Sequence, residues 1–475
     1  MSRPHSPDFL RELAEIVGTA GYRVRETERA AYRSDGLPTH RVPPALVILP
    51  DTQAQVVAIV RLLHKYRIPF VARGAGTGLS GGALADDTAA LIVLTRLNRI
   101  LAIDADNRRA QVEPGVVNQA LSDAAAPFGL HFAPDPSSQV ACTIGGNVAE
   151  NAGGPHCLKY GVTANHVVAI DAVLATGELV TLGSAQGERW GPDLVGLFTG
   201  SEGTFGIALA ITVRLTPLPE QVVTLLAGFP SIRAGGEAVS AIIASGIVPA
   251  ALEMMDQACV RVVEASIYAA GYPTDAAAVL LCEVDGSAAS VAEEAAAVER
   301  LFGEHGAAVI HRAESDSERA RLWKGRKRAF GAMGRLGRDL AVQDAVVPRS
   351  ALPDILERIA EIRERYALVI SNVFHAGDGN LHPNISFDSR EPGVLERVRQ
   401  ASAEIMSACL TLGGTITGEH GVGLDKIAWM DELFDGPSLQ AMCDVRNVFD
   451  PEHRANPNKV IPVHACREWT AGGAR

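Results

Sequence analysis

The sequence predicts an α+β protein made of two folded units, and three observations support this prediction. Residues 45–72 read as strand, helix and strand, because apolar runs at 45–49 and 68–72 flank a stretch with helical apolar spacing at 56–63. The residues after Pro219 alternate short strands with Ala- and Glu-rich helices, which favours an antiparallel or mixed sheet with helices on one face. The 475-residue chain is 47% hydrophobic and 21% charged, as in globular proteins with a large core.

Local signals place the boundaries of these units. Thr52 followed by Gln55 is a capping-box pattern that starts the first predicted helix. Strand candidates follow at 91–94 and 100–104. Pro217 and Pro219 resist both helix and central strand, which indicates a linker. We therefore expect a helical N-terminal leader (1–42), a first domain (43–218), a second domain (219–413) and a C-terminal segment (414–475) that folds back onto the first domain.

Charge and cysteine content argue against several functions. The 43 Lys and Arg residues against 55 Asp and Glu residues give a net charge of −12, which disfavours nucleic acid as a partner. The seven cysteines are scattered without a Cys-x-x-Cys pair, which favours a reducing, cytoplasmic setting and argues against an iron–sulfur cluster in this chain. The sequence shows no signal peptide and no apolar run of about 18 residues, so we expect at most a peripheral association with the inner membrane.

Four glycine-rich segments indicate a site for a phosphate-containing cofactor in the first domain. The loop 73–82 (RGAGTGLSGG) contains the G-x-G-x-x-G spacing, but no helix opens at its last glycine, so the dinucleotide fingerprint does not apply. Consecutive backbone N–H groups in such a loop can still bind phosphate. The other segments are 143–154, 159–161 and 200–207, and a single glycine turn does not account for four loops.

The sharpest signal is a pair of histidines in 372–384 (NVFHAGDGNLHPN), followed by the motif Gly-Glu-His-Gly at 418–421. The turn between them lets His375 and His382 face each other across a hairpin. Glu419 can add a carboxylate, and two imidazoles with one carboxylate make a divalent-metal site that suits zinc, manganese or iron. Neighbouring residues on an extended chain point apart, so His420 is then the candidate general base.

Further residues are expected to support these histidines. Asp378 and Asn380, within the turn, are expected to orient the imidazoles. The basic run at 323–328 (WKGRKR) contains Arg326, which we choose as the group that binds a substrate carboxylate, because a guanidinium binds a carboxylate through two parallel hydrogen bonds. A solvated basic helix face remains the alternative interpretation for its neighbours Lys324, Lys327 and Arg328.

Together these motifs resemble the FAD-linked 2-hydroxy-acid dehydrogenases, a family of vanillyl-alcohol oxidase-type flavoproteins that includes D-lactate dehydrogenase, D-2-hydroxyglutarate dehydrogenase and the FAD-linked subunit of glycolate oxidase. The resemblance runs from about residue 30 to Pro462 and is carried by the glycine loops, VQDAVVP at 342–348, HAGDGNLH at 375–382, GEHG at 418–421 and NPNK at 456–459. It implies a two-lobed (PCMH-type) FAD-binding domain and an α+β cap domain with an antiparallel sheet.

The resemblance also implies which residues bind FAD and substrate. The loop 73–81 corresponds to the pyrophosphate loop, 143–151 approaches the pyrophosphate and isoalloxazine, and Ile207 lies by the adenine. The loop 73–82 lacks the His or Cys that this family uses for covalent attachment, so we expect non-covalent FAD, with Cys157 the remaining nearby thiol. Asn384 and Lys459 are expected to contact substrate. The predicted FAD-binding residues are Arg73, Gly74, Ala75, Gly76, Thr77, Gly78, Leu79, Ser80, Pro134, Thr143, Gly145, Gly146, Asn147, Asn151, Gly161, Glu202, Gly203, Gly206, Ile207 and Asn456.

The reaction that the resemblance implies is oxidation of a small 2-hydroxy acid, glycolate or D-lactate, to the 2-oxo acid. The hydroxyglutarate enzymes carry an extra lysine shortly before the aspartate that corresponds to Asp344, where this chain has Ala-Val-Gln at 341–343. The alternatives are a D-2-hydroxyglutarate or other D-2-hydroxy-acid dehydrogenase, a non-catalytic electron-relay subunit and a nicotinamide-dependent flavin reductase. We expect an external electron acceptor (a quinone, a cytochrome or an iron–sulfur subunit), and partner subunits like those of the family's glycolate oxidase.

Overall fold

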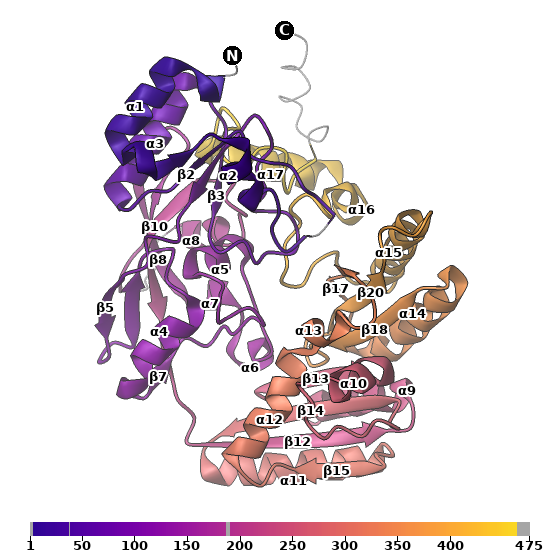
Figure 1. Ribbon diagram of the computed structural model, residues 1–475. Coiled ribbons are helices and arrows are strands. Elements are labelled where there is room, and N and C mark those ends of the chain that lie inside the picture. The colour runs from indigo at the N-terminus through magenta and orange to yellow at the C-terminus, as the bar shows by residue number, and fades with distance from the viewer. Residues whose placement is uncertain (1–2, 38, 187–190, 463–475) are drawn as a thin grey trace. The chain divides into compact units, whose positions relative to one another are not determined.

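The computed structural model describes residues 3–37, 39–186 and 191–462, and the chain forms two compact units (Figure 1). Unit 1 comprises Met1–Gly153, Val162–Leu218 and Glu419–Arg475. Unit 2 comprises Gly154–Gly161 and Pro219–Gly418. The chain therefore passes from unit 1 to unit 2 and back twice.

The first lobe of unit 1 is built on the predicted strand–helix–strand, which the structure confirms. Thr52 Oγ1 accepts from Gln55 N–H at 3.2 Å and Gln55 Oε1 accepts from Asp51 N–H at 2.7 Å, so both side chains cap α3. The four-stranded sheet has the order β1-β2-β4-β3, in which only β1 is antiparallel to its neighbour. The elements are α1 (Pro7–Val17), β1 (Tyr22–Arg23), α2 (Glu26–Arg29), β2 (Leu46–Ile48), α3 (Gln53–Tyr66), β3 (Phe70–Arg73) and β4 (Ala90–Val93).

The N-terminal leader is an integral part of this lobe. Helix α1 packs its buried side chains Phe9 and Leu13 into the same core cluster as the apolar face of α3. Strand β1 extends the sheet by pairing with β2. Residues 1–42 therefore contribute core and sheet to the first domain.

The second lobe of unit 1 is a five-stranded antiparallel sheet of order β5-β6-β10-β8-β9 with its own core. Phe449, at the end of α17, stacks on Phe205 with ring centroids 4.5 Å apart, so the C-terminal segment packs into this lobe. The elements are β5 (Ile100–Asp104), β6 (Arg109–Val112), α4 (Asn118–Ala125), β7 (Leu130–His131), α5 (Ile144–Glu150), α7 (Thr163–His166), β8 (Val167–Val173), β9 (Leu179–Gly183), α8 (Leu194–Phe198), β10 (Ile207–Arg214), β11 (Thr216–Pro217), α16 (Met430–Leu433) and α17 (Gly436–Phe449).

Unit 2 is a seven-stranded antiparallel sheet of order β15-β12-β14-β13-β18-β20-β16. Two short strands, β17 and β19, pair with each other antiparallel and form a separate two-stranded sheet. The elements are α6 (Cys157–Tyr160), β12 (Gln221–Phe229), α9 (Ile232–Ala244), β13 (Ala251–Asp256), α10 (Gln257–Glu264), β14 (Ala278–Gly286), α11 (Ala288–Glu304), β15 (Val309–Arg312), α12 (Asp316–Lys327), α13 (Ala329–Met333), β16 (Asp339–Val342), β17 (Ala345–Val346), α14 (Leu352–Tyr366), β18 (Val369–Phe374), β19 (Asn380–Leu381), β20 (Pro383–Phe387) and α15 (Val394–Thr411).

Helices cover both faces of this sheet, so the prediction of helices on one face was wrong. Met255 belongs to a core cluster with α10, α12 and α13. The next residue toward the N-terminus, Met254, points to the opposite face, where it lies against Gly235 of α9. Eight consecutive residues of β14 are buried, as expected for a strand covered on both sides.

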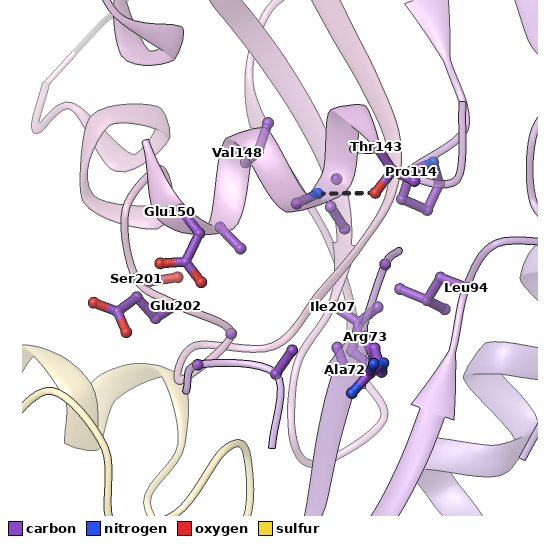
Figure 2. A pocket seen from close by; sticks show the side chains of 18 of the residues that line it. Ala72, Arg73, Leu94, Pro114, Thr143, Val148, Glu150, Ser201, Glu202 and Ile207 are labelled. Carbon is purple, nitrogen blue, oxygen red and sulfur yellow. Dashed lines mark hydrogen bonds between the residues drawn. The ribbon is translucent and has the colours of Figure 1, made fainter. Parts of the chain in front are cut away.

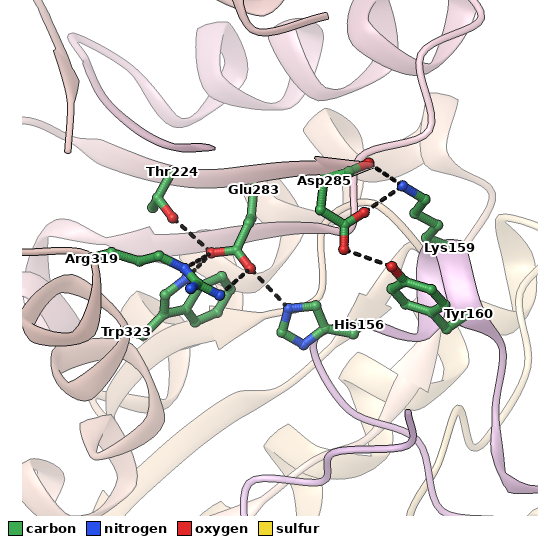
Figure 3. Close-up of polar contacts among 8 residues, drawn as sticks. All are labelled: His156, Lys159, Tyr160, Thr224, Glu283, Asp285, Arg319 and Trp323. Carbon is green, nitrogen blue, oxygen red and sulfur yellow. Dashed lines mark hydrogen bonds and ion pairs between the residues drawn. The ribbon is translucent and has the colours of Figure 1, made fainter. Parts of the chain in front are cut away.

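The segment Gly154–Gly161 belongs to unit 2, although the sequence analysis places it within the first domain (Figure 3). His156 Nε2 lies 3.2 Å from Glu283 Oε1, and the Tyr160 hydroxyl donates to Asp285 Oδ2 at 2.6 Å. Lys159 Nζ pairs with the side chain and carbonyl of the same aspartate. These contacts between charged and polar side chains distant in sequence leave no pattern in the segment itself.

Glu283 is the centre of this network. Its carboxylate also accepts from Thr224 Oγ1 at 2.6 Å, from Arg319 Nε at 3.0 Å and from Trp323 Nε1 at 2.5 Å. Burial alone would raise the pKa of Glu283, but the hydrogen bonds from His156 and Arg319 outweigh burial and lower the pKa to about 2. The buried charge is therefore fully compensated.

The last boundary between the units falls after Gly418, later than the predicted boundary at 413. Thr415 exchanges two backbone hydrogen bonds with Val346. Thr417 Oγ1 and the Gly418 N–H donate to Asp344 Oδ2 at 2.6 and 3.0 Å. Residues 415–418 are thus hydrogen-bonded to unit 2.

Across the described residues, none of the helices combines the length and apolar character needed to cross a bilayer.

Replacing Glu283 with Gln should destabilise the protein, because glutamine leaves at least one donor facing an NH₂ group. The lowered pKa of Glu283 corresponds to about 3 kcal/mol of stability above pH 4.5, which is lost as the pH falls from there through about 2. We expect E283Q to lower the free energy of unfolding at pH 7 by about that amount in denaturant titrations.

The exposed Glu293 on α11 provides the control, since E293Q should change the free energy of unfolding by less than about 0.5 kcal/mol. Equal stabilities for E283Q and E293Q would contradict the central role of Glu283.

Candidate functional site

Unit 1 contains a cavity where the carboxyl end of β3 meets α5 and the start of β10 (Figure 2). It encloses about 650 Å³ of space, part of it open to solvent. Nine residues predicted to bind FAD line it: Arg73, Gly74, Thr143, Gly145, Gly146, Glu202, Gly203, Gly206 and Ile207. The lining residues that the sequence analysis did not select are Ala72, Gly82, Ala83, Leu94, Pro114, Val148, Ala149, Glu150, Phe198, Ser201 and Ala208.

Glycines let the walls of this cavity approach one another. A Cβ on Gly74 would lie 2.4 Å from Thr143 Oγ1, and one on Gly145 would lie 2.6 Å from Pro114 Cβ. Gly206 has a φ of +141°, and a Cβ there would lie 2.5 Å from the Val173 carbonyl oxygen. Gly146 differs, because a Cβ on it would meet only Thr143 Oγ1, at 3.4 Å. A side chain at position 146 would therefore enter the cavity.

Arg73 provides a test of whether a pyrophosphate fits here. Its Nη2 donates to the Ser34 carbonyl at 2.9 Å, while its Nη1 is buried without a hydrogen-bond partner among the described residues. Burial lowers the pKa of Arg73, and Asp35 opposes this effect. A phosphate oxygen would supply the missing acceptor for Nη1 with a charge-assisted hydrogen bond. The cavity therefore fits the predicted cofactor at this atom.

Other predicted FAD-binding residues lie outside the lining and have structural partners. Asn118 Nδ2 donates both to Asn147 Oδ1 and to the Pro134 carbonyl, so these hydrogen bonds hold α5 in place. Asn151 ends α5 in the left-handed conformation with a φ of 52°. The FAD contacts predicted for the remaining residues stay predictions; these residues are Ala75, Gly76, Thr77, Gly78, Leu79, Ser80, Gly161, which lies in unit 2, and Asn456.

Unit 2 brings the two predicted histidines together across the expected turn. His375 follows β18 and His382 lies between β19 and β20, and both are buried. Their ring centroids are 5.2 Å apart and the rings are perpendicular. His375 exchanges backbone hydrogen bonds with Asn380, which closes the turn. Gly418 packs directly on the Asn380 side chain, since a Cβ there would lie 2.5 Å from Asn380 Cγ.

A buried carboxylate that the sequence analysis missed orients His375. Glu253 Oε1 lies 2.7 Å from His375 Nδ1, and Glu253 Oε2 lies 2.5 Å from Arg326 Nη2. Burial would raise the pKa of Glu253, but Arg326 and His375 together lower it. A carboxylate at Nδ1 favours the tautomer with the proton on that nitrogen and fixes the orientation of the ring. The signal in the sequence was a single acidic residue inside the apolar strand Ala251–Asp256.

Arg326, which was predicted to bind a substrate carboxylate, is fully buried and already paired with Glu253. Its Nε and Nη1 have no hydrogen-bond partner within the part of the chain that the structure describes. Two donors are thus left over for a further acceptor. The substrate contact of Arg326 stays a prediction.

His382 lies beside a second buried carboxylate. Its Nδ1 is 3.3 Å from the Gln343 carbonyl oxygen and 3.9 Å from Asp344 Oδ1. The other oxygen of Asp344 binds Thr417 and Gly418, as described above. The next two residues in the chain, Glu419 and His420, belong to unit 1.

The two predicted substrate contacts have different surroundings. Asn384 is fully buried in β20, where its Nδ2 donates to the His382 carbonyl at 2.5 Å; its Oδ1 has no partner among the described residues. Lys459 is buried in unit 1, where its Nζ donates to the Leu84 carbonyl and to Asn456 Oδ1, each at 2.6 Å. Burial lowers the pKa of Lys459 to about 8, against the attraction of Glu202 and Asp86. These bonds hold the ammonium group inside unit 1, and the substrate contact of Lys459 stays a prediction.

The chain matches two protein families, and its sequence and fold are similar to those of known proteins. Residues 44–183 match the family "FAD binding domain", and residues 218–460 match "FAD linked oxidases, C-terminal domain". The chain is 47% identical over 447 residues to glycolate oxidase subunit GlcD of Escherichia coli (strain K12), covering 94% of this chain and 89% of the relative. It is 32% identical to D-lactate dehydrogenase of Archaeoglobus fulgidus over 437 residues, covering 91% and 95%. Its fold resembles p-cresol methylhydroxylase with a TM-score of 0.82, at 16% identity and 96% and 97% coverage.

Replacing Gly146 with Leu should displace FAD without disturbing the fold, because the new side chain enters the cavity while glycine-to-leucine substitution favours a helix. We expect the affinity for FAD to fall about ten- to a hundredfold, the cost of overpacking a filled site. The measurement is the FAD-to-protein ratio after gel filtration, read from the flavin absorbance.

Gly303 is the matched control: it also lies in a helix, α11, and a Cβ there would meet nothing within 4 Å. G303L should keep the wild-type FAD content. Stoichiometric FAD in G146L would show that the cofactor lies elsewhere.

Proposed function

The chain belongs to the FAD-linked oxidases, and on this basis we propose that it oxidises a small 2-hydroxy acid, glycolate or D-lactate, to the 2-oxo acid. The observation that carries the proposal is the buried pair of His375 and His382 with Glu253 behind it. A subunit that only relays electrons would not need two facing imidazoles, one of them oriented by a carboxylate. The names of the two relatives support the choice of substrates.

A single carboxylate in the substrate is the second part of the proposal. The position before Asp344 at which the hydroxyglutarate enzymes carry a lysine is occupied by uncharged residues here. Gln343 directs its side-chain amide to Ser402 Oγ at 3.0 Å. The site therefore lacks that cation for a second carboxylate, which favours glycolate or D-lactate over D-2-hydroxyglutarate.

We propose His375, His382 and Glu419 as the ligands of a divalent metal ion (zinc, manganese or iron). His375 fits this role because the Glu253 carboxylate lies at its Nδ1, and His382 fits it because its Nδ1 faces the Gln343 carbonyl and Asp344. A bound ion would polarise the substrate hydroxyl and lower its pKa.

The remaining roles follow from the chemistry of the side chains. His420 takes the hydroxyl proton, since an imidazole is a base near neutral pH. The two unpaired donors of Arg326 bind the substrate carboxylate and fix which face of C2 is presented. FAD bound non-covalently in unit 1 would supply the acceptor for the C2 hydrogen, which is transferred as hydride.

Electrons then leave for an external acceptor in this proposal. A quinone, a cytochrome or an iron–sulfur subunit would serve, and subunits like those of glycolate oxidase are candidate partners. Such an association would bring the protein to the inner membrane from the cytoplasm. Acid precipitation tests the non-covalent attachment, because the yellow colour should stay in the supernatant.

Replacing His420 with Ala should slow reduction of the flavin by substrate about 10²- to 10⁴-fold while FAD stays bound, because the base is lost. The measurement is anaerobic stopped-flow bleaching of the flavin with glycolate, D-lactate, L-lactate, D-2-hydroxyglutarate and NADPH, with and without chelator.

His305, at the end of α11 in unit 2, supplies the control variant H305A, which should bleach at the wild-type rate. Full-rate bleaching of H420A would remove His420 from the mechanism. Bleaching of the wild-type protein by NADPH alone would favour the flavin reductase, and no bleaching by any compound would favour the electron relay.

Replacing Glu253 with Gln should weaken divalent-metal binding about 10- to 100-fold, because an amide no longer holds the His375 proton at Nδ1 with a charge. Zinc and manganese titrations of the apoprotein by calorimetry measure the change. E361Q, on the exposed face of α14, should bind like the wild-type protein. Equal affinities for E253Q and E361Q would contradict the assignment of His375 as a ligand.

A further inference from the structure

The loop that follows His420 is held by hydrogen bonds from two other segments of unit 1. The N–H groups of Val422 and Gly423 donate to the two oxygens of Glu202, at 2.6 and 2.8 Å. The N–H of Leu424 donates to the Ser80 carbonyl at 2.9 Å. Three consecutive backbone amides are thus fixed to residues that lie hundreds of positions earlier in the chain.

Two glycines let this loop lie against its partners. Gly421 has a φ of +85°, and a Cβ on it would lie 2.4 Å from Glu150 Oε2 and 2.7 Å from Glu202 Oε1. Gly423 has a φ of +50°, and a Cβ on it would lie 2.1 Å from the Ser80 carbonyl oxygen. The loop is therefore in close contact with both carboxyl groups and cannot shift toward them.

The same carboxyl groups line the predicted FAD cavity, and Figure 2 shows them side by side. Glu202 is buried and Glu150 is half-buried. Burial and the neighbouring Glu202 raise the pKa of Glu150 well above its ordinary value. Burial also raises the pKa of Glu202, against the two backbone N–H groups that it accepts and the positive charges of Lys426 and Lys459.

We infer that Glu202 is a positioning residue for His420. The Glu202 carboxylate fixes the loop after the proposed base to the wall of the FAD cavity, and Glu150 packs beside Glu202. This inference rests on the proposed role of His420. Glu202 was predicted to bind FAD, but both of its carboxylate oxygens are engaged by the loop. Glu202 thereby links the loop after the proposed base to the wall of the cavity in which FAD is predicted to bind.

Replacing Glu202 with Gln tests the inference, because one of its two acceptors becomes an NH₂ group that faces a backbone N–H. We expect faster hydrogen exchange at 421–424, and flavin reduction at saturating substrate slowed about tenfold or more, since a displacement of about 1 Å can cost up to a hundredfold. The KM should stay within about threefold and FAD should stay bound. E202D keeps both acceptors and should recover part of the rate.

A second variant reaches the same loop without altering a carboxyl group. G423A places a methyl group against the Ser80 carbonyl and should give the same exchange and the same loss of rate. It covers the case in which E202Q does not fold. E113Q is the control, because Glu113 is also buried in unit 1 and accepts a backbone N–H, from Arg99 at 2.9 Å.

The outcomes separate this inference from the proposed function. Wild-type exchange at 421–424 in E202Q, or wild-type rates in both variants, would overturn the inference. A loss of FAD from E202Q with an unchanged rate per bound flavin would also overturn it and would assign Glu202 to the cofactor. If no 2-hydroxy acid reduces the wild-type flavin, the proposed function fails, and the positioning of His420 for that reaction fails with it, even where the exchange data still show that Glu202 holds the loop.

Discussion

A buried carboxylate is tolerated only when donors from the protein surround it, and this constraint organises both units. Glu283 binds four side chains from three separate segments of unit 2, which are β12, α12 and Gly154–Gly161. Glu253 holds a helix arginine and a turn histidine in fixed relation to each other. Asp344 fixes the residues just before Glu419, and Glu202 fixes the residues just after His420. The Glu-His motif that contains the proposed base is thus flanked by hydrogen bonds to Asp344 before it and to Glu202 after it.

Patterns that act over a few residues were predictable from the sequence. The capped helix α3 between two buried strands and the turn between the histidines both depend on neighbours in the chain, and the structure confirms them. Nine of the residues predicted to bind FAD line the cavity of unit 1, because glycine-rich loops mark close approaches of the backbone. The family resemblance supplied the two-lobed domain, which composition and periodicity alone could not.

The misses depend on contacts between distant segments. Glu253 is one acid in an apolar strand and has no motif, so only its partners His375 and Arg326 reveal its role. Both faces of the unit 2 sheet are buried, and a nearly continuous apolar strand such as β14 does not tell one covered face from two. Residues 154–161 contain glycine, lysine and tyrosine, which fit a cofactor loop as well as they fit the contacts with unit 2.

The order of the segments along the chain has a consequence for biosynthesis. Unit 1 consists of three pieces, and the last of them begins at Glu419, after all of unit 2. A nascent chain that has completed both sheets of unit 1 still lacks the partners of Glu202, the stacked ring of Phe449 and the strand-like contact between Phe70 and Ala455. Domains generally fold as units during synthesis, N-terminal first. Here the FAD domain can finish folding only after all of unit 2 has been synthesised, so a chain cut before Glu419 would keep the cap but not a closed cofactor domain.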